Sequence, residues 1–338
     1  MPILSVEALR SFTLDVLEKL GTPPEYAQIV CNSLVGANLV GHDSHGVLRL
    51  TSYARLVDEG KIVPAATPIV DWRNRAAAHV DGHWGWGPVG ARLGTETALA
   101  LAAEFGIAAV TVDRCAHIGR IGEYVALMAE AGMVGMALCN HYPAVAPFGG
   151  RERIFGTNPV ALATPGGPNR PPILVDFATS GVAEGKLRVA RAKGETVAPG
   201  LIVDSDGHPS QTPGDFYAGG ALLPFGAHKG YGLGLMVEIL GGLLSGAGIS
   251  ALPGFEGANG TLLVAIDIAH FAPTETFARQ AGALAQHISA SKPAAGFERV
   301  LVPGEPEHNT YAHRNAHGIP IPDTTWSELQ ELQRSLTR

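Results

Sequence analysis

The chain has few of the residues on which several protein classes depend. Its three cysteines, Cys31, Cys115 and Cys139, lie far apart without a CxxC spacing, which argues against a disulfide framework and a thiolate metal site. Charged residues make up 16% of the 338 residues, and no run of Lys or Arg forms a basic stripe. We therefore expect neither nucleic acid nor an anionic membrane surface as a partner.

Two further features concern location. The first residues, Met1 to Ser5, show no basic segment followed by an apolar one, so the sequence predicts a cytoplasmic protein whose partners are small molecules. An apolar run from Gly230 to Ile249 is interrupted by glycines and has Glu238 at its centre, which predicts a buried helix and not a membrane span. Hydrophobic residues supply 46% of the chain, enough for one large domain or two medium ones.

Helix and strand signals divide the chain into a helical beginning and an alternating remainder. Capping residues, prolines and glycines bound three helices before residue 60. From residue 69 onward, β-branched runs alternate with helical stretches, which is typical of an α/β protein. The predicted helices are 5–21, 23–41, 47–59, 89–105, 123–131, 182–193 and 274–291, with a last one opened by a capping box at Thr325–Glu328. The predicted strands are 76–80, 107–113, 134–138, 173–177, 261–268 and 299–302.

The segment from Gly41 to Leu50 carries the strongest chemical signal. His45 and Arg49 are four residues apart, so on a helix they would project from the same face. Arginine grips a carboxylate with a planar fork, and histidine can take up and return a proton near neutral pH. This pair suits a 2-hydroxy or 2-oxo acid. The alternative is a capping or core histidine beside a surface arginine.

Two strand-to-helix junctions are candidate anion sites. The segment from His117 to Tyr124 follows a predicted strand, contains two glycines and opens a helix, whose free amides attract an anion. Arg120 would add a charged contact to a pyrophosphate there, and His117 is either a second acid/base candidate or a strand cap. His228 and Lys229 place a cation at the start of the apolar helix, which is a weaker signal of the same kind.

Three segments, a turn, a strand end and the start of a predicted helix, carry polar side chains that would reach a ligand. Thr157 lies in a turn from Phe155 to Pro159 and would hydrogen-bond carboxylate or ribose oxygens, unless the turn is purely structural. Asp176 ends a predicted strand, where α/β sheets bind ligands, and would equally serve as a helix cap. In Glu184-Gly185-Lys186, the lysine would offset the charge of a substrate carboxylate or of a cofactor.

Other patterns match a motif only by letter. The segment from Gly85 to Gly90 fits G-x-G-x-x-G, but Pro88 removes an amide that phosphate would need, so we predict a turn into a helix and no Rossmann loop. Histidines 308, 313 and 317 lack an HExxH context and predict an exposed helix face and no metal. Ser44 beside His45 lacks a G-x-S-x-G elbow, which argues against a serine hydrolase.

Six motifs in order resemble the malate/L-lactate dehydrogenase family of the sulfolactate dehydrogenase type. They are Asp43-Ser44-His45-Gly46, His117-x-Gly119-x-x-Gly122-x-Tyr124, Gly156-Thr157-Asn158-Pro159, Asp176-Phe177-Ala178-Thr179-Ser180, Lys229-Gly230-Tyr231-Gly232 and Pro303-Gly304-Glu305-Pro306. The resemblance implies a non-Rossmann α/β fold in which a mixed-sheet domain, residues 76–305, binds NAD or NADP. A helical domain, residues 1–75 with 306–338, would carry the catalytic histidine and arginine. It also implies a homodimer with its active site near the subunit interface.

The resemblance assigns roles to individual residues. His45 becomes the proton donor to the substrate oxygen, Ser44 its support, and Arg49 the ligand of the substrate carboxylate. Thr157 lines the substrate pocket. Some members use the histidine matching His117 as the base, so this choice stays open. The implied cofactor contacts are His117, Ile118, Gly119, Arg120, Ile121, Asp176, Phe177, Ala178, His228, Lys229, Gly304, Glu305, Pro306 and Glu307.

The expected activity is reversible hydride transfer between a nicotinamide and C2 of a small 2-hydroxy acid such as malate or lactate. Imine reductases of the family carry His-Gly-Asp where this chain has the substrate-site residues Glu184-Gly185-Lys186, which favours the hydroxy-acid branch. The alternatives are a reductase of cyclic imine carboxylates and, more remotely, a non-catalytic ligand-binding protein. The sequence leaves open whether NAD or NADP is the cofactor.

Overall fold

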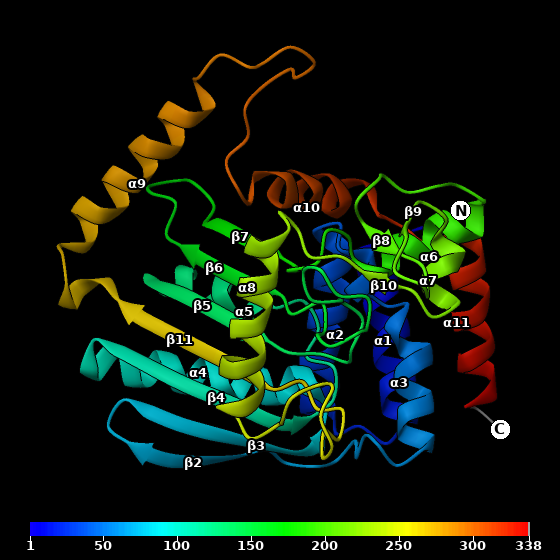
Figure 1. Cartoon of the computed structure of the whole chain (residues 1–338). Helices are drawn as coiled ribbons and strands as arrows, with labels where there is room; N and C mark the ends of the chain where they lie inside the picture. Colours follow the sequence, from blue (N-terminus) through cyan, green and yellow to red (C-terminus); the bar gives the residue numbers. More distant parts are fainter. Residues whose placement is uncertain (337–338) are drawn as a thin grey trace.

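A seven-stranded mixed sheet forms the centre of the computed structural model, which describes residues 1–336 (Figure 1). Its strand order is β2-β3-β4-β11-β5-β6-β7, in which β3 and β4 run parallel and every other neighbouring pair is antiparallel. The strands are β2 (Ile69–Asn74), β3 (Ala77–Gly85), β4 (Ile107–Cys115), β11 (Thr261–Asp267), β5 (Met133–Cys139), β6 (Val160–Thr164) and β7 (Ile173–Phe177). The mixed α/β architecture predicted from the sequence is confirmed.

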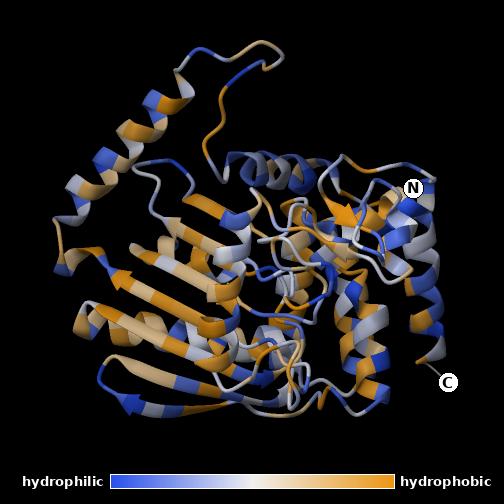
Figure 2. Ribbon diagram, in the orientation of Figure 1, coloured by the Kyte–Doolittle hydropathy of each residue, from blue (hydrophilic) through white to orange (hydrophobic). Residues whose placement is uncertain are grey.

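Two helices cover one face of this sheet and a third crosses the other. Helices α4 (Gly87–Phe105) and α5 (Gly122–Glu130) lie behind the sheet in Figure 1, and α8 (His228–Val237) lies in front. The strands bury small and β-branched side chains against α4 and α5, and Figure 2 shows how hydrophobic these strands are. A Cβ added at Gly94 of α4 would lie 2.9 Å from Val112, so glycine permits the close approach of helix and sheet.

The two ends of the chain share a second core. Helices α1 (Val6–Lys19), α2 (Pro24–Leu39) and α3 (Arg49–Asp58) pack with the C-terminal α11 (Asp323–Ser335), as the apolar cluster that includes Leu9, Leu34, Leu50 and Leu329 shows. Strand β1 (Ile3–Leu4) pairs with β12 (Ile319–Pro320), and α10 (Glu305–His317) lies beside α2. Trp86 joins this core from the sheet segment. The predicted domain boundaries, 1–75 with 306–338 and 76–305, stay a prediction.

A small third unit, which the sequence did not predict, lies beside the site. Strands β8 (Ile202–Val203), β9 (Pro209–Ser210) and β10 (Ala221–Leu222) form a three-stranded sheet with helices α6 (Glu184–Lys193) and α7 (Pro213–Tyr217) nearby. Its apolar core includes Phe155, Leu187 and Phe216. The strands have two residues each, too few to show an alternating pattern in the sequence.

Three predictions for individual elements are wrong or incomplete. Residues 299–302, predicted as a strand, form a loop, after which Pro303 accepts a hydrogen bond from the Leu174 amide at 3.2 Å. The last helix begins at Asp323 after Pro322, before the capping box predicted at 325–328, because proline fixes a backbone angle suited to a helix start. Strand β6 was missed, since it is short and lies between two prolines.

The apolar run from 230 to 249 is only half buried. Helix α8 changes at Glu238 into a π-helix, η2 (Glu238–Leu243), and Gly234, Val237 and Glu238 face inward. The outer side, which we call the α8 apolar face, consists of Leu235, Met236, Ile239, Leu243 and Leu244, all exposed. No helix within residues 1–336 is long and apolar enough to cross a membrane. Beyond β11 and the short η3 (Ile268–His270), helix α9 (Thr274–Ser289) projects from the body of the molecule (Figure 1).

Candidate active site

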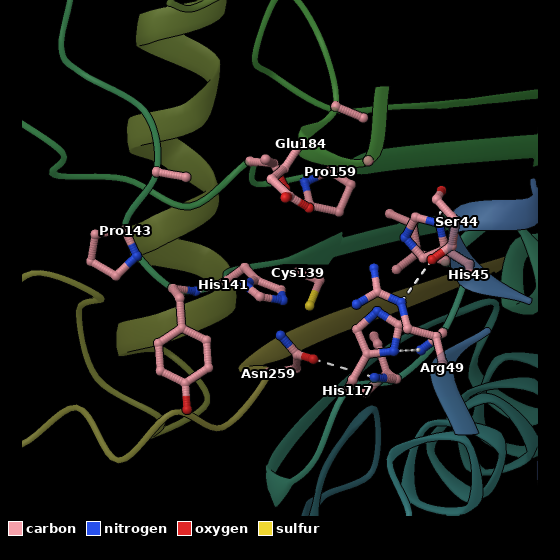
Figure 3. A pocket seen from close by; sticks show the side chains of 18 residues that line it. Ser44, His45, Arg49, His117, Cys139, His141, Pro143, Pro159, Glu184 and Asn259 are labelled. Carbon is pink, nitrogen blue, oxygen red and sulfur yellow. Dashed lines mark hydrogen bonds between the residues drawn. The ribbon is translucent and has the colours of Figure 1, made fainter. Parts of the chain in front are cut away.

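A cavity of about 220 Å³ lies where the helical part of the chain meets the segments that follow β4, β5 and β7 (Figure 3). It is lined by many of the residues that the sequence singled out. These are Ser44, His45, Arg49, His117, Ile118, Gly119, Ile121, Thr157, Glu184 and Gly185. Segments separated by more than a hundred residues therefore converge on one small space.

His45 and Arg49 reach the cavity by a route that differs from the prediction. Residues Asp43–His45 form a single 3-10 turn, η1, and α3 starts only at Arg49, so the two side chains do not share a helix. Arg49 instead folds back, and its Nε donates a 2.7 Å hydrogen bond to the Ser44 carbonyl. Between them, a Cβ added at Gly46 would overlap the buried Asn38 amide, so glycine lets the chain pass over it.

The η1 turn is fixed by contacts that are distant in sequence. Arg314 of α10 holds the Asp43 carboxylate with both guanidinium nitrogens, at 2.6 and 3.1 Å. The Asn38 side chain donates to Asp43 at 2.7 Å and accepts from the Val47 amide at 2.8 Å. Because these contacts flank Ser44 and His45 on both sides, they set where His45 points.

Three histidines surround the cavity, and one of them was not predicted. The rings of His45 and His117 are stacked with centroids 5.5 Å apart, and His141 meets His117 edge to face at 6.2 Å. His141 follows β5, and its only sequence signal was its place just after a strand end. Figure 3 shows His141 and Arg49 facing the same space.

Hydrogen bonds fix the tautomers of two of these rings. His117 Nδ1 accepts from the Gly119 amide at 3.3 Å and lies 2.9 Å from the Tyr53 hydroxyl, so its proton is on Nε2. His141 Nδ1 accepts from the Tyr142 amide at 2.7 Å, which leaves its proton on Nε2 as well. His45 differs, because its Nδ1 lies 3.0 Å from the Ser44 hydroxyl, a partner that can either donate or accept.

Burial makes the three imidazoles neutral. It lowers the pKa of His45 to about 3 and that of His141 to about 4, and it holds the pKa of His117 well below its ordinary value. The positive charge of Arg49 lowers the pKa of all three further. The cavity thus combines one guanidinium with neutral rings, an arrangement suited to an organic anion.

A second cluster beside the cavity has the groups that a dinucleotide needs. Arg120 Nη1 is buried without a hydrogen-bond partner and lies 3.7 Å from Asp176. Asp176 accepts a 2.9 Å hydrogen bond from the Gly122 amide, so it does cap α5, while burial raises the pKa of its carboxyl group. His42 and Glu307 lie 3.4 Å apart at the start of α10. The unsatisfied guanidinium fits a phosphate oxygen, and the carboxylates fit ribose hydroxyls.

Several predicted site residues do not line the cavity. They are Lys186, Phe177, Ala178, His228, Lys229, Gly304, Glu305, Pro306 and Glu307. Lys186 is exposed, Phe177 packs edge-on against Phe225 at 5.7 Å, and Glu305 binds Arg170 at 3.1 Å. His313 and His317 stack on an exposed helix face with ring centroids 4.5 Å apart. Within the described part of the chain, no group of three His, Cys, Asp or Glu could hold a metal.

Comparison with known proteins identifies the family. The model of the malate/L-lactate dehydrogenase family matches residues 4–330. This chain belongs to that family. The family resemblance seen in the six motifs is thereby confirmed, and the protein is an oxidoreductase of this group.

Relatives extend over almost the whole chain. A malate dehydrogenase of Pyrococcus abyssi is 39% identical over 97% of this chain and 93% of its own length. An L-sulfolactate dehydrogenase of Methanocaldococcus jannaschii is 36% identical, covering 99% and 97%. A delta(1)-pyrroline-2-carboxylate reductase of Burkholderia ambifaria is 32% identical, covering 98% and 97%. The solved malate dehydrogenase of Entamoeba histolytica has a TM-score of 0.95 at 28% identity, covering 100% and 98%.

Proposed function

We propose that the protein catalyses reversible hydride transfer between NAD or NADP and C2 of a small 2-hydroxy acid, giving the 2-oxo acid. The observation that carries this proposal is the convergence of Arg49, His45 and His117 on one cavity, beside the buried Arg120, whose Nη1 makes no hydrogen bond. Relatives named for malate and L-sulfolactate support the same substrate class.

Arg49 binds the substrate carboxylate. Because its Nε is already bonded to the Ser44 carbonyl, its orientation is fixed and its two terminal nitrogens face the carboxylate. A carboxylate held by two parallel hydrogen bonds cannot rotate freely, so C2 is presented in one orientation. Thr157, Glu184 and Gly185 line the same space. Lys186 is exposed on the same turn of α6, and its positive charge would attract the substrate carboxylate at the entrance of the cavity.

We assign the acid/base role to His45 and a polarising role to His117. When His45 Nδ1–H donates to the Ser44 hydroxyl, Nε2 is free to take the hydroxyl proton of the substrate during oxidation. His117 already uses Nδ1 as an acceptor, so its Nε2–H can only donate, which suits stabilisation of the substrate oxygen. The two histidines therefore divide between proton transfer and oxygen binding.

The dinucleotide would be held by the cluster beside the cavity. Arg120 would bind its phosphates, with His117 to Ile121 lining the same site. Asp176, Glu307 and residues 304–306 at the start of α10 would bind its ribose hydroxyls, with Phe177, Ala178, His228 and Lys229 further out. When bound, the reduced nicotinamide ring supplies the hydride that C2 receives.

The experiment is a substrate panel run with both reduced cofactors. Pyruvate and oxaloacetate, with NADH and with NADPH, are compared with Δ1-piperideine-2-carboxylate and Δ1-pyrroline-2-carboxylate by loss of nicotinamide absorbance. Oxidation of NADH or NADPH in the presence of pyruvate or oxaloacetate supports the proposal. Turnover of the imines alone contradicts it in favour of the second candidate, cyclic imine reduction, which the Burkholderia relative supports. NADH binding without turnover of any compound favours a non-catalytic binding protein.

We further propose that the protein is a cytoplasmic homodimer. The α8 apolar face and the projecting α9 expose large apolar side chains, among them Leu243 at 57% and Leu284 at 57%. A second copy of the chain would cover such a surface. The inner side of the same helix contacts loops of the cavity through Glu238, which supports an active site near the subunit interface. The three buried free cysteines suit a reducing compartment.

A further inference from the structure

We propose that Glu238 is a positioning residue that holds together the two loops carrying His141 and Thr157. The inference rests on the proposed function, because it concerns how the substrate cavity keeps its shape. Glu238 is 1% exposed and is the first residue of the π-helix η2. Short π-helical insertions are frequent at functional sites, where they redirect a side chain.

The two oxygens of Glu238 bind different loops. Oε1 accepts from the Gly156 amide at 3.2 Å and from the Asn158 side chain at 3.0 Å, on either side of Thr157. Oε2 accepts from the Asn140 side chain at 3.2 Å, next to His141. Ser250 donates its amide to Oε2 at 3.2 Å, and its hydroxyl oxygen lies 2.9 and 3.1 Å from Oε1 and Oε2. One buried carboxylate therefore joins three segments.

The chemistry of the site requires a group that only accepts hydrogen bonds. Every partner of Glu238 presents an N–H or O–H group, and the two oxygens of a carboxylate have acceptor sites for all of them. Hydrogen bonds to a charged acceptor are stronger than those between neutral groups. They also hold Asn158 in a left-handed backbone conformation, at φ 41°, that non-glycine residues rarely adopt.

The loops that Glu238 binds also touch each other. A Cβ added at Gly156 would lie 2.5 Å from the His141 carbonyl, which accepts a hydrogen bond from the Ser250 hydroxyl. Movement of one loop would therefore displace the other. Because His141 and Thr157 both line the cavity, Glu238 sets the spacing between the groups that face the substrate.

Glu238 reaches the proposed dinucleotide site only through other residues. Asn140 accepts from the Asn259 side chain at 2.9 Å, and Asn259 in turn accepts from the Ile118 amide at 3.3 Å. Two further side chains thus separate Glu238 from the segment between His117 and Ile121. Loss of the Glu238 carboxylate should therefore weaken binding of the 2-oxo acid more than binding of the dinucleotide.

The test compares Glu238→Gln with the wild type. Glutamine keeps the size, but its NH₂ group would face N–H donors, so one of the two loops is released. We expect the KM for the 2-oxo acid to rise ~10-fold or more, with a smaller loss in kcat and a dissociation constant for NADH within about twofold of the wild type. Ser250→Ala removes three hydroxyl contacts and should raise KM less. The control is Thr95→Val, a buried hydroxyl within α4 that should leave KM unchanged.

An unchanged KM in Glu238→Gln, or an equal loss of affinity for NADH and for the 2-oxo acid, would overturn the proposal. If Glu238→Gln does not fold, the same comparison of KM for the 2-oxo acid with the affinity for NADH is made on Ser250→Ala, and the same outcomes would overturn the proposal. Amide hydrogen exchange provides a readout independent of turnover. Residues 140–144 and 155–159 should exchange faster in either variant, and unchanged exchange would also overturn the proposal. If the wild type reduces no 2-oxo acid, the proposed function fails while the exchange result still tests Glu238.

Discussion

Burial lowers the pKa of the imidazoles and of the guanidinium in the cavity, but only the imidazoles lose their proton near neutral pH. A histidine moved out of water loses its proton, and His45, His117 and His141 all have lowered pKa values for this reason. Arg49 keeps its charge, because even a lowered pKa of an arginine stays far above neutral pH. The site thus attracts an anion while keeping a neutral imidazole available as a proton acceptor.

Replacement of His45 tests the acid/base assignment. In His45→Ala the substrate oxygen has no group to exchange its proton with, so kcat should fall by a factor of ~10² to 10⁴. The dissociation constant for NADH, measured by fluorescence, should change little, since the residues proposed to bind its phosphates are untouched. The exposed His308→Ala is the control. Turnover that survives in His45→Ala would transfer the role to His117.

At the scale of the element, α10 connects the two halves of the site. Glu307 in its first turn contacts His42, and Arg314 near its end holds Asp43 beside Ser44 and His45. The helix has no fully buried residue and is mostly hydrophilic in Figure 2. Its position therefore depends on polar contacts, and these contacts also orient η1.

Removal of the Arg314 guanidinium should disturb His45 without touching it. In Arg314→Met, Asp43 keeps only the Asn38 side chain, so η1 gains freedom and kcat should fall roughly 10- to 100-fold. Steady-state kinetics at saturating cofactor measure this effect. Arg92→Met, which breaks an exposed ion pair within α4, is the matched control and should keep full activity. Equal kinetics in the two variants would show that the Asp43 contact does not position His45.

The sequence predicted elements whose signals are local. Ser5 caps α1 through the Ala8 amide at 3.1 Å, and the turn from Gly85 into α4 appeared as expected. Asp176 served as a cap because its strand ends beside α5. The break between His45 and Arg49 could not be predicted, since it depends on Asn38 of a neighbouring helix lying under Gly46. His141 and Glu238 were missed as site residues for the same reason, because their roles depend on contacts between distant segments.

At the scale of the whole molecule, the α8 apolar face makes oligomeric state testable. A charge placed on this face should oppose burial against a second copy, so Met236→Glu should shift the protein from dimer towards monomer. Sedimentation velocity over a range of protein concentrations measures this shift. Gln330→Glu, which adds the same charge at an exposed position of α11, controls for net charge. A monomeric wild type, or a dimeric Met236→Glu, would place the subunit interface elsewhere.

The buried histidines also predict how stability depends on pH. Their pKa values are lower in the folded protein than in the unfolded chain, so between about pH 6.5 and pH 4 the unfolded state binds more protons. The free energy of unfolding should therefore fall as pH decreases below about 6.5, by at most ~1.4 kcal/mol per pH unit for each histidine. Urea unfolding at fixed protein concentration, at pH 7 and pH 5, measures this. His141→Gln should show a smaller fall, whereas His308→Gln should match the wild type.

Because Arg49 folds back onto the Ser44 carbonyl, the charge of a bound carboxylate would influence the pKa of His45. A carboxylate that docks on this guanidinium neutralises the cation that lowers the basicity of the neighbouring rings. Arrival of the anion would thus make His45 a stronger base at the moment when its partner oxygen is beside it. In the reducing direction, binding of the 2-oxo acid would favour uptake of a proton from solvent by His45. His45 would then donate this proton to the carbonyl oxygen as the hydride reaches C2.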